Sequence, residues 1–166
     1  ESRELEVPGF DFDDITYHHD VTGRIARIAF NRPEVRNAFR PRTVDQLYSA
    51  LDDARQNTKI GVVLITGNGP SPKDGGWAFC SGGDVNWFKQ GVEDESVDLP
   101  AEVRRDVEVL HQAIIDFRRL PYPTIAAING PAAGAGMSLA LSCDFRIASE
   151  DAFLAIAYGR IGSSPD

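Results

Sequence analysis

Residues 123–144 (PTIAAINGPAAGAGMSLALSCD) constrain the fold of this chain more than any other stretch. The apolar run at 124–128 has the length and composition of a strand that is covered on both faces. Residues 129–131, Asn-Gly-Pro, end that run. Residues 134–136, Gly-Ala-Gly, then lead into mostly good helix formers. The stretch therefore predicts a buried strand, a tight bend and the start of a helix, which is typical of α/β folds.

The same bend also has the features of a binding or reactive site. Its small residues let another group approach the backbone closely. The first N–H groups of a helix lack intrahelical partners and carry partial positive charge. Such a bend holds an anion, or an oxygen that becomes one during a reaction. Taken alone, the stretch is better explained as a glycine-rich turn that serves packing only.

Composition narrows the class of protein. The length of 166 residues suits about one domain, and 42 % hydrophobic residues support a core. The net charge of −8 argues against a general nucleic-acid surface, and no apolar run reaches the ~18 residues that span a membrane. The acidic N-terminus lacks the features of a signal peptide. Cys80 and Cys143 lie in apolar stretches and form no metal-site spacing. We therefore expect a cytoplasmic protein without metal, nucleic-acid partner or membrane partner.

Elements along the chain follow a repeating order of strand, strand and helix, which predicts an α/β fold. Residues 1–14 are expected to be an acidic, flexible lead-in to one core, residues 15–166. The turn-like sequence at 162–166 suggests that this core is incomplete at its C-terminus. Residues 91–99 are expected to be acidic and mobile. Periodicity predicts an edge strand at 15–19, strands at 24–30, 60–66, 77–80, 145–148 and 153–156, and helices at 41–56, from 84, and at 100–120.

A second bend, residues 79–84 (FCSGGD), has the same design as the first. A short buried strand ends in small residues, and Asp84 is expected to cap the following helix rather than to act in catalysis. If the strands before the two bends lie side by side, the N–H groups of Gly83 and Ala135 converge on one carbonyl oxygen. Two converging donors form an oxyanion hole, and each contributes roughly 3 kcal/mol to a transition state.

These motifs, residues 78–84 and 129–144, resemble the crotonase (enoyl-CoA hydratase/isomerase) superfamily, and Asn31-Arg32-Pro33 with Asn37-Ala38-Phe39 is similar to its N-terminal signature. The resemblance covers the chain from about residue 15. It implies a spiral of ββα units that binds acyl-CoA thioesters, with coenzyme A entering as substrate and no permanently bound cofactor. It also implies a homotrimer or hexamer, and helices beyond residue 166 that complete the fold.

The resemblance assigns roles by position. Gly83 and Ala135 match the two backbone donors that polarise the thioester carbonyl and stabilise the enolate. Residues expected near the adenine and phosphate groups of coenzyme A are Val35, Arg36, Ala38, Lys73, Ala78, Ser81 and Gly82. Arg36 and Lys73 are either partners of the phosphates or solvated surface charges.

The reaction is less constrained than the fold. Ser138 stands where a hydratase of the family has its first catalytic glutamate, and Tyr158 stands near the second. Two-glutamate hydration is therefore disfavoured, and both residues are candidate pocket residues, with Tyr158 able to donate a hydrogen bond. Asp166 matches a segment in which family isomerases place a catalytic aspartate, which moves a proton from the α-carbon to the γ-carbon. Asp166 is otherwise a turn residue or a helix cap.

The N-terminal half points to another subfamily. Residues 31–41 and 66–84 look very like 1,4-dihydroxy-2-naphthoyl-CoA synthases, which close a ring on an o-succinylbenzoyl thioester, and this likeness fades after Asp84. The sequence thus predicts an enzyme that acts through a thioester enolate, as an isomerase or hydratase-like protein. The alternatives are the ring-closing synthase and a non-catalytic acyl-CoA-binding or assembly subunit.

Overall fold

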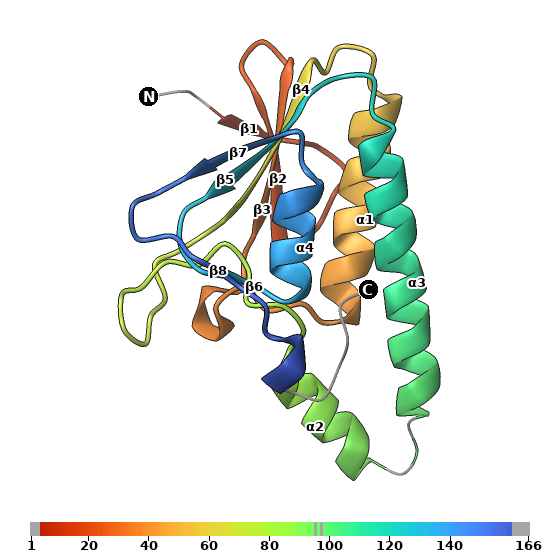
Figure 1. Cartoon of the computed structure of the whole chain (residues 1–166). Helices are drawn as coiled ribbons and strands as arrows, with labels where there is room; N and C mark the ends of the chain where they lie inside the picture. Colours follow the sequence, from red (N-terminus) through yellow and green to blue (C-terminus); the bar gives the residue numbers. More distant parts are fainter. Residues whose placement is uncertain (1–3, 95, 97, 161–166) are drawn as a thin grey trace.

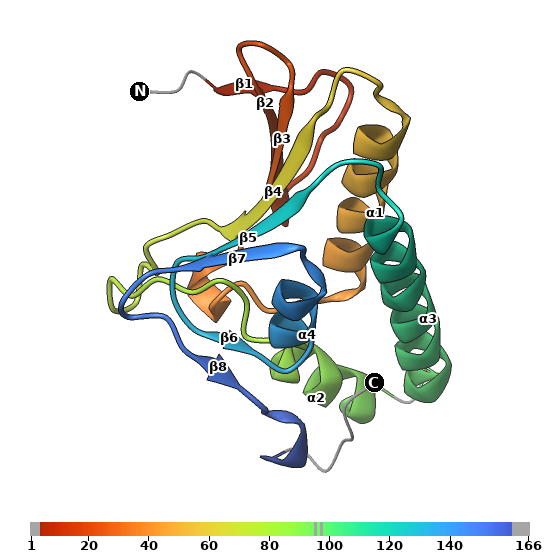
Figure 2. The same cartoon turned by 45° about the horizontal axis from the view of Figure 1, so that its top comes forward.

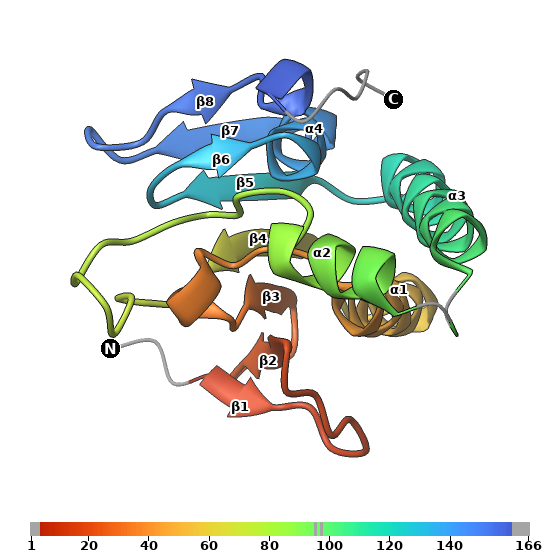
Figure 3. The ribbon, with the colours of Figure 1, turned by 90° about the horizontal axis from the view of Figure 1, so that it is seen from below.

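A mixed six-stranded sheet carries the other elements in the computed structural model, which describes residues 4–94, 96 and 98–160. The strand order is β1-β2-β3-β4-β5-β7, and Figure 3 shows this stack from below. The first two pairings are antiparallel and the other three are parallel. The strands are β1 (Glu4–Glu6), β2 (Ile15–Asp20), β3 (Ile25–Phe30), β4 (Val62–Gly67), β5 (Thr124–Ile128) and β7 (Phe145–Ala148).

Two long helices, α1 (Pro41–Gln56) and α3 (Leu99–Arg118), lie side by side on one face of the sheet (Figure 1). The shorter α4 (Ala135–Ser142) packs between β5 and α3, and α2 (Val85–Glu93) crosses one end of the bundle. Pro41 occupies the first turn of α1, where its missing N–H loses no intrahelical bond. Single 3₁₀ turns form at η1 (Pro33–Val35) and η2 (Tyr158–Arg160).

A second, smaller layer runs beneath the carboxyl ends of the parallel strands (Figure 2). It contains the parallel pair β6 (Ala132–Ala133) and β8 (Leu154–Ala155). Two isolated parallel bridges extend it, Phe39 to Gly83 and Cys80 to Ala132. Each turn of the chain therefore adds one long strand to the large sheet and one short piece to the small layer, which is the expected ββα spiral.

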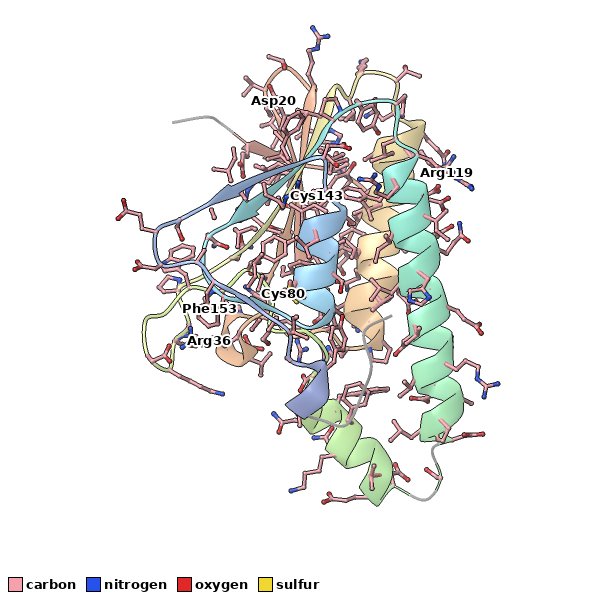
Figure 4. All side chains as sticks on the ribbon, viewed as in Figure 1. Asp20, Arg36, Cys80, Arg119, Cys143 and Phe153 are labelled. Atoms are coloured by element: carbon pink, nitrogen blue, oxygen red, sulfur yellow. The ribbon has the colours of Figure 1, made fainter. Side chains whose placement is uncertain are left out.

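The core fills the space between the large sheet and the helices. Its largest fully buried side chains include three phenylalanines, Phe30 of β3, Phe117 of α3 and Phe79 at the start of the second bend. Phe30 contacts Phe79 edge-on, with ring centroids 5.9 Å apart. The residues before the second bend are thus anchored directly to the sheet. By contrast, β7 is exposed along its length, and Phe153, which follows it, lies on the outside of the ribbon (Figure 4).

The N-terminal residues differ from the prediction. β1 pairs with β2 in the register Glu4 to Asp20, so β2 is not the edge strand that the sequence predicts. Phe10 and Phe12 of the expected lead-in pack against the core. β1 is only three residues long and lies in an acidic segment, so it has no apolar periodicity from which the sequence could reveal it.

Asp14, also in the expected lead-in, is buried, so the core extends upstream of residue 15. Its carboxylate accepts hydrogen bonds from Arg40 (2.7 and 2.5 Å) and from the Thr43 hydroxyl (2.6 Å). Burial raises the pKa of Asp14, but the hydrogen bonds from Arg40 and Thr43 outweigh it and hold the pKa below its ordinary value. This carboxylate therefore ties the N-terminal segment to the start of α1.

Two further predictions are corrected. Residues 77–80 are not a strand: within the described part of the chain, only Cys80 bridges to Ala132. The Pro131 carbonyl accepts from both Phe79 and Cys80, a geometry that a regular ladder does not allow. Both ends of the segment 91–99, which was expected to be acidic and mobile, are helical: residues 91–93 lie in α2, and Leu99 begins α3. The predicted helix at 41–56 is confirmed residue for residue, and the helix predicted at 100–120 spans Leu99–Arg118.

Candidate functional site

The two glycine bends lie against each other. The Cys80 carbonyl accepts a hydrogen bond from the Ala133 N–H at 2.9 Å. Gly82 has a φ of +91°, and a Cβ on it would lie 2.9 Å from the Ala133 oxygen and 3.6 Å from the Ala135 nitrogen. Only glycine permits both this conformation and this approach. The side-by-side arrangement on which the predicted oxyanion hole depends is therefore present.

Gly83 and Ala135 line one pocket of about 360 Å³. The Gly82 carbonyl accepts from the Phe39 N–H, and the Asp84 N–H donates to the Phe39 carbonyl, both at 2.7 Å. These bonds fix the bend on either side of Gly83. Among the described residues, no hydrogen-bond partner is found for the N–H of Gly83 or of Ala135. Two backbone donors thus border one pocket without a partner in the described protein, an arrangement that suits an incoming oxygen.

Backbone contact between α4 and the second bend positions Ala135. A Cβ on Gly136 would lie 2.4 Å from the Cys80 carbonyl oxygen, so the first turn of α4 rests directly on Cys80. Figure 4 shows Cys80 beside that end of α4. Burial raises the pKa of the Cys80 thiol to about 12, against smaller lowering effects of the Gly82 N–H and Arg32. The thiol is therefore neutral near pH 7 and is not a nucleophile.

Asp84 caps α2, as the sequence predicts. Its Oδ1 accepts from the backbone N–H groups of Asn86 (3.0 Å) and Trp87 (3.4 Å). Its Oδ2 accepts from Arg32 at 2.8 Å, and Arg32 also donates to the Ala38 carbonyl at 2.7 Å. Arg32 and Asp84 thus link the segment around Ala38 to the bend that carries Gly83.

The residues expected near coenzyme A gather beside the second bend. Arg36 and Asn37 adopt left-handed conformations, with φ of 57° and 58°. This turn brings the Val35 and Arg36 carbonyls onto Ser81, whose hydroxyl and N–H donate to them at 3.3 and 3.1 Å. Asn37 donates to the Ala78 carbonyl at 2.8 Å. The structure therefore brings together the predicted residues Val35, Arg36, Ala38, Ala78, Ser81 and Gly82.

The side chain of Asn37 holds this turn together through hydrogen bonds. The sequence did not predict this role. Its side chain is buried, accepts from the Arg32 N–H at 2.9 Å and donates to two carbonyls. The available signal was its residue type, because asparagine tolerates the left-handed region better than most residues.

The two basic residues proposed for the phosphates lie on the outer side of this cluster. Arg36 pairs with Asp74 and donates to the Trp77 carbonyl at 3.4 Å. Lys73 is exposed in the neighbouring loop. Figure 4 shows Arg36 at the same side of the molecule as this loop. Their contact with phosphate stays a prediction.

Ser138 and Tyr158 meet inside the site. The Ser138 Oγ and the Tyr158 Oη are 2.8 Å apart, and Tyr158 is buried and lines the pocket. The two residues predicted to stand in place of a hydratase's glutamates thus form a pair of hydrogen-bonded hydroxyl groups, and that correspondence stays a prediction. Asp166, the predicted base, lies outside the described residues.

The rest of the pocket is largely apolar and comes mainly from α2 and α3, with Pro41 and Val44 of α1 and the guanidinium-bearing Arg40 beside them. Its apolar walls include Val85, Trp87, Phe88, Val103, Val107 and Leu110. Asp106 of α3 lines the same pocket and is the only carboxylate among the described lining residues. The sequence analysis missed Asp106. The signal was helical spacing, because 103, 106 and 110 fall on one face of a helix.

Two further findings concern the described residues, 4–160 without 95 and 97. Their histidine, cysteine and carboxylate side chains form no cluster of three or more that suits a metal ion. None of their helices has the length and apolarity needed to cross a membrane.

A ββα spiral with paired glycine bends at an apolar pocket defines the class of this protein. Residues 20–166 match the model of the enoyl-CoA hydratase/isomerase family, and the chain belongs to that family. It is 50 % identical over 153 residues to a 1,4-dihydroxy-2-naphthoyl-CoA synthase of Mycobacterium tuberculosis, across 87 % of this chain and 48 % of the relative. The identity to the synthase of Mycolicibacterium smegmatis is 50 % over 157 residues, across 87 % and 50 %.

Solved structures show the same fold. An enoyl-CoA hydratase from Polaromonas sp. JS666 superposes with a TM-score of 0.77 at 35 % identity, across 92 % of this chain and 54 % of that one. An enoyl-CoA hydratase/carnithine racemase from Magnetospirillum magneticum gives a TM-score of 0.78 at 25 % identity, across 97 % and 55 %. The chain spans about half the length of the curated relatives that it matches.

Proposed function

We propose that this chain provides the thioester-binding and enolate-stabilising part of an acyl-CoA enzyme. The observation that carries this proposal is the pair of adjacent bends with the Gly83 and Ala135 N–H groups at one pocket. Membership of the enoyl-CoA hydratase/isomerase family supports an acyl-CoA substrate. Coenzyme A would lie along the cluster that contains Val35 and Ser81, with its phosphates near Arg36 and Lys73.

In the proposed reaction, the thioester oxygen accepts hydrogen bonds from Gly83 and Ala135. Negative charge moves onto this oxygen when a base removes the α-proton, so the donors stabilise the enolate more than the substrate. Loss of one such donor lowers rates by about 10²–10³-fold in other enzymes. The apolar walls of the pocket would exclude water and strengthen these bonds.

Ala135 offers a direct test, because it is the first residue of α4. Proline is well accommodated at a first helical position, so Ala135→Pro removes the N–H donor with little change of backbone. We expect exchange of the α-proton of a saturated acyl-CoA in D₂O to fall by about 10²–10³-fold. Ala135→Gly, which keeps the N–H, is the matched control. Equal exchange rates in the two variants, both binding the acyl-CoA, would contradict the oxyanion hole.

The first candidate reaction is double-bond isomerisation or a related hydratase-like step. The hydroxyl pair of Ser138 and Tyr158 replaces two carboxylates, which disfavours two-glutamate hydration. Asp166 would remove the α-proton and return it to the γ-carbon, so that no net proton is consumed. Asp166→Asn should abolish conversion of a 3-enoyl-CoA while acyl-CoA binding persists. Full activity of that variant would rule out this role of Asp166.

The second candidate is ring closure by a naphthoyl-CoA synthase. It is favoured by the 50 % identity across 87 % of this chain to such synthases. Both reactions use a thioester enolate, so the same two donors serve either. Assaying an o-succinylbenzoyl thioester beside a 3-enoyl thioester, with the protein at its full natural length, separates the two. Tight binding of both without any α-proton exchange would favour a non-catalytic acyl-CoA-binding or assembly subunit.

We also propose a homotrimer or a hexamer as the functional assembly. Family membership supports this proposal, as does the exposed apolar surface near β7 and β8, which includes Phe145, Ile147, Phe153 and Ile156. Light scattering on the full-length protein measures the assembly directly. A monomer at micromolar concentration would contradict the proposal.

A further inference from the structure

One carboxyl group lines the largely apolar pocket that α1, α2 and α3 border. The guanidinium of Arg40, which also lines this pocket, is already paired with Asp14. The carboxyl belongs to Asp106, which lines the pocket together with Val103, Val107 and Leu110 of the same helix, and with Phe88 of α2. Only 15 % of the Asp106 side chain is exposed. A group of this kind is rarely buried without a partner, because removing a carboxyl from water is unfavourable.

Within the described protein, only one oxygen of the Asp106 carboxylate accepts a hydrogen bond. Arg105 donates from Nη1 to the Asp106 Oδ1 at 3.0 Å, and from Nη2 to Asp45 at 2.9 Å. No hydrogen bond to the Asp106 Oδ2 is found among the described residues. The guanidinium is shared with an exposed carboxylate and is itself half exposed, so it compensates Asp106 weakly.

The pKa of the Asp106 carboxyl is raised above its ordinary value, which is consistent with a carboxyl that lacks part of its hydrogen bonds. Burial raises the pKa of its carboxyl, while the charge of Arg105 lowers it and the charges of Asp45 and Glu102 raise it. A carboxyl that protonates more readily donates to an oxygen as well as accepting from a hydroxyl.

We propose that Asp106 is a specificity-determining residue that selects acyl groups bearing a hydrogen-bonding oxygen, such as a hydroxyl or a keto group, over plain hydrocarbon chains. The inference rests on the proposed function, because it takes the thioester carbonyl to lie at Gly83 and Ala135. The acyl chain then extends into the same pocket, between α2 and α3. A hydrocarbon there leaves the Asp106 carboxyl without a partner, whereas an oxygen on the chain completes its hydrogen bonds.

Binding of hexanoyl-CoA and of its 4-, 5- and 6-hydroxy derivatives to the full-length protein tests this inference by calorimetry. We expect the best hydroxylated ester to bind about tenfold more tightly than hexanoyl-CoA. Asp106→Leu should abolish or reverse this preference, and Asp106→Asn, which still forms hydrogen bonds, should keep part of it. Asp45→Asn is the companion variant: it leaves the Arg105 guanidinium to Asp106 alone and should therefore weaken the preference without touching the pocket lining.

A preference that is absent from the unmodified protein, or that is equally strong in Asp106→Leu, would overturn the assignment. Asp106→Ala replaces the leucine variant if the latter does not fold, with the same expected result. Exchange of the α-proton of hexanoyl-CoA in D₂O, measured on the same samples, reports the proposed function separately. Exchange without selectivity refutes only the role of Asp106, and selectivity without exchange refutes only the enolate chemistry.

Discussion

The Arg32–Asp84 pair makes a sharp stability prediction. Asp84 has two roles that different substitutions separate: it caps α2 and it neutralises Arg32. Asp84→Asn keeps an oxygen that caps the helix but removes the charge. Asp84→Ala removes both. Both variants lose the ion pair, so the difference between their free energies of unfolding measures the contribution of the cap.

The structure sets the magnitude of each effect. The side chains of Arg32 and Asp84 are only 12 % and 8 % exposed, so the loss of this charged hydrogen bond should cost about 2 kcal/mol. Asp14 lies 3.8 Å from Arg32 and remains as a second carboxylate, which keeps the cost below that of an isolated buried charge. Losing the cap adds about 1 kcal/mol. We expect destabilisation of about 2 kcal/mol for Asp84→Asn and about 3 kcal/mol for Asp84→Ala.

Urea unfolding near neutral pH measures both values, and an Arg32→Met, Asp84→Asn double-mutant cycle isolates the pair. We expect a coupling energy of about 1.5–3 kcal/mol. A coupling energy near zero, or equal stability of the asparagine and alanine variants, would refute the reasoning. A coupling energy near zero would show that the ion pair does not stabilise the fold. Equal stability of the two variants would show that the cap does not.

Three further predictions concern other parts of the fold. Burial raises the pKa of both Cys80 and Cys143 to about 12, so iodoacetamide should label neither thiol until urea unfolds the protein. The pKa of Asp14 is lower in the folded state, so its contribution to stability is complete above the unfolded pKa of about 3.9 and is lost as pH falls through the folded pKa. Urea unfolding at decreasing pH should show this loss, and Asp14→Asn should flatten it. Gly136→Ala should destabilise by at least about 2 kcal/mol, because its Cβ would meet the Cys80 carbonyl oxygen. Gly159→Ala, with nothing within 4 Å of the new Cβ, should be nearly neutral, and thermal unfolding of the two variants measures the difference.

The regular elements were largely predictable, because their signals are local. The helix at Pro41–Gln56 has a proline in its first turn and a continuous apolar face, and the structure confirms it. The bends were predictable from their glycines, and Asp84 from its position before a helix. Each of these features depends on a few neighbouring residues, so tertiary contacts had little to override.

What the sequence did not predict depends on contacts between distant residues. β1 is stabilised by its pairing with β2 and has no apolar pattern of its own. The turn at Arg36 and Asn37 is held by Ala78 and Ser81, about forty residues away. Asp106 was overlooked because a charged residue on a helix usually faces water, and only the pocket shows that it does not.

The contact between Gly136 and the Cys80 carbonyl has a consequence for how such a site diversifies. Both proposed donors are main-chain atoms, and main-chain contacts hold the bends that carry them. Side-chain substitutions at Ser138 and Tyr158 therefore alter the groups around the carbonyl without moving the atoms that would polarise it. In the proposed mechanism, activation of the thioester and the choice of reaction would therefore be separable traits, so that a few side-chain changes would suffice for new chemistry on the same scaffold.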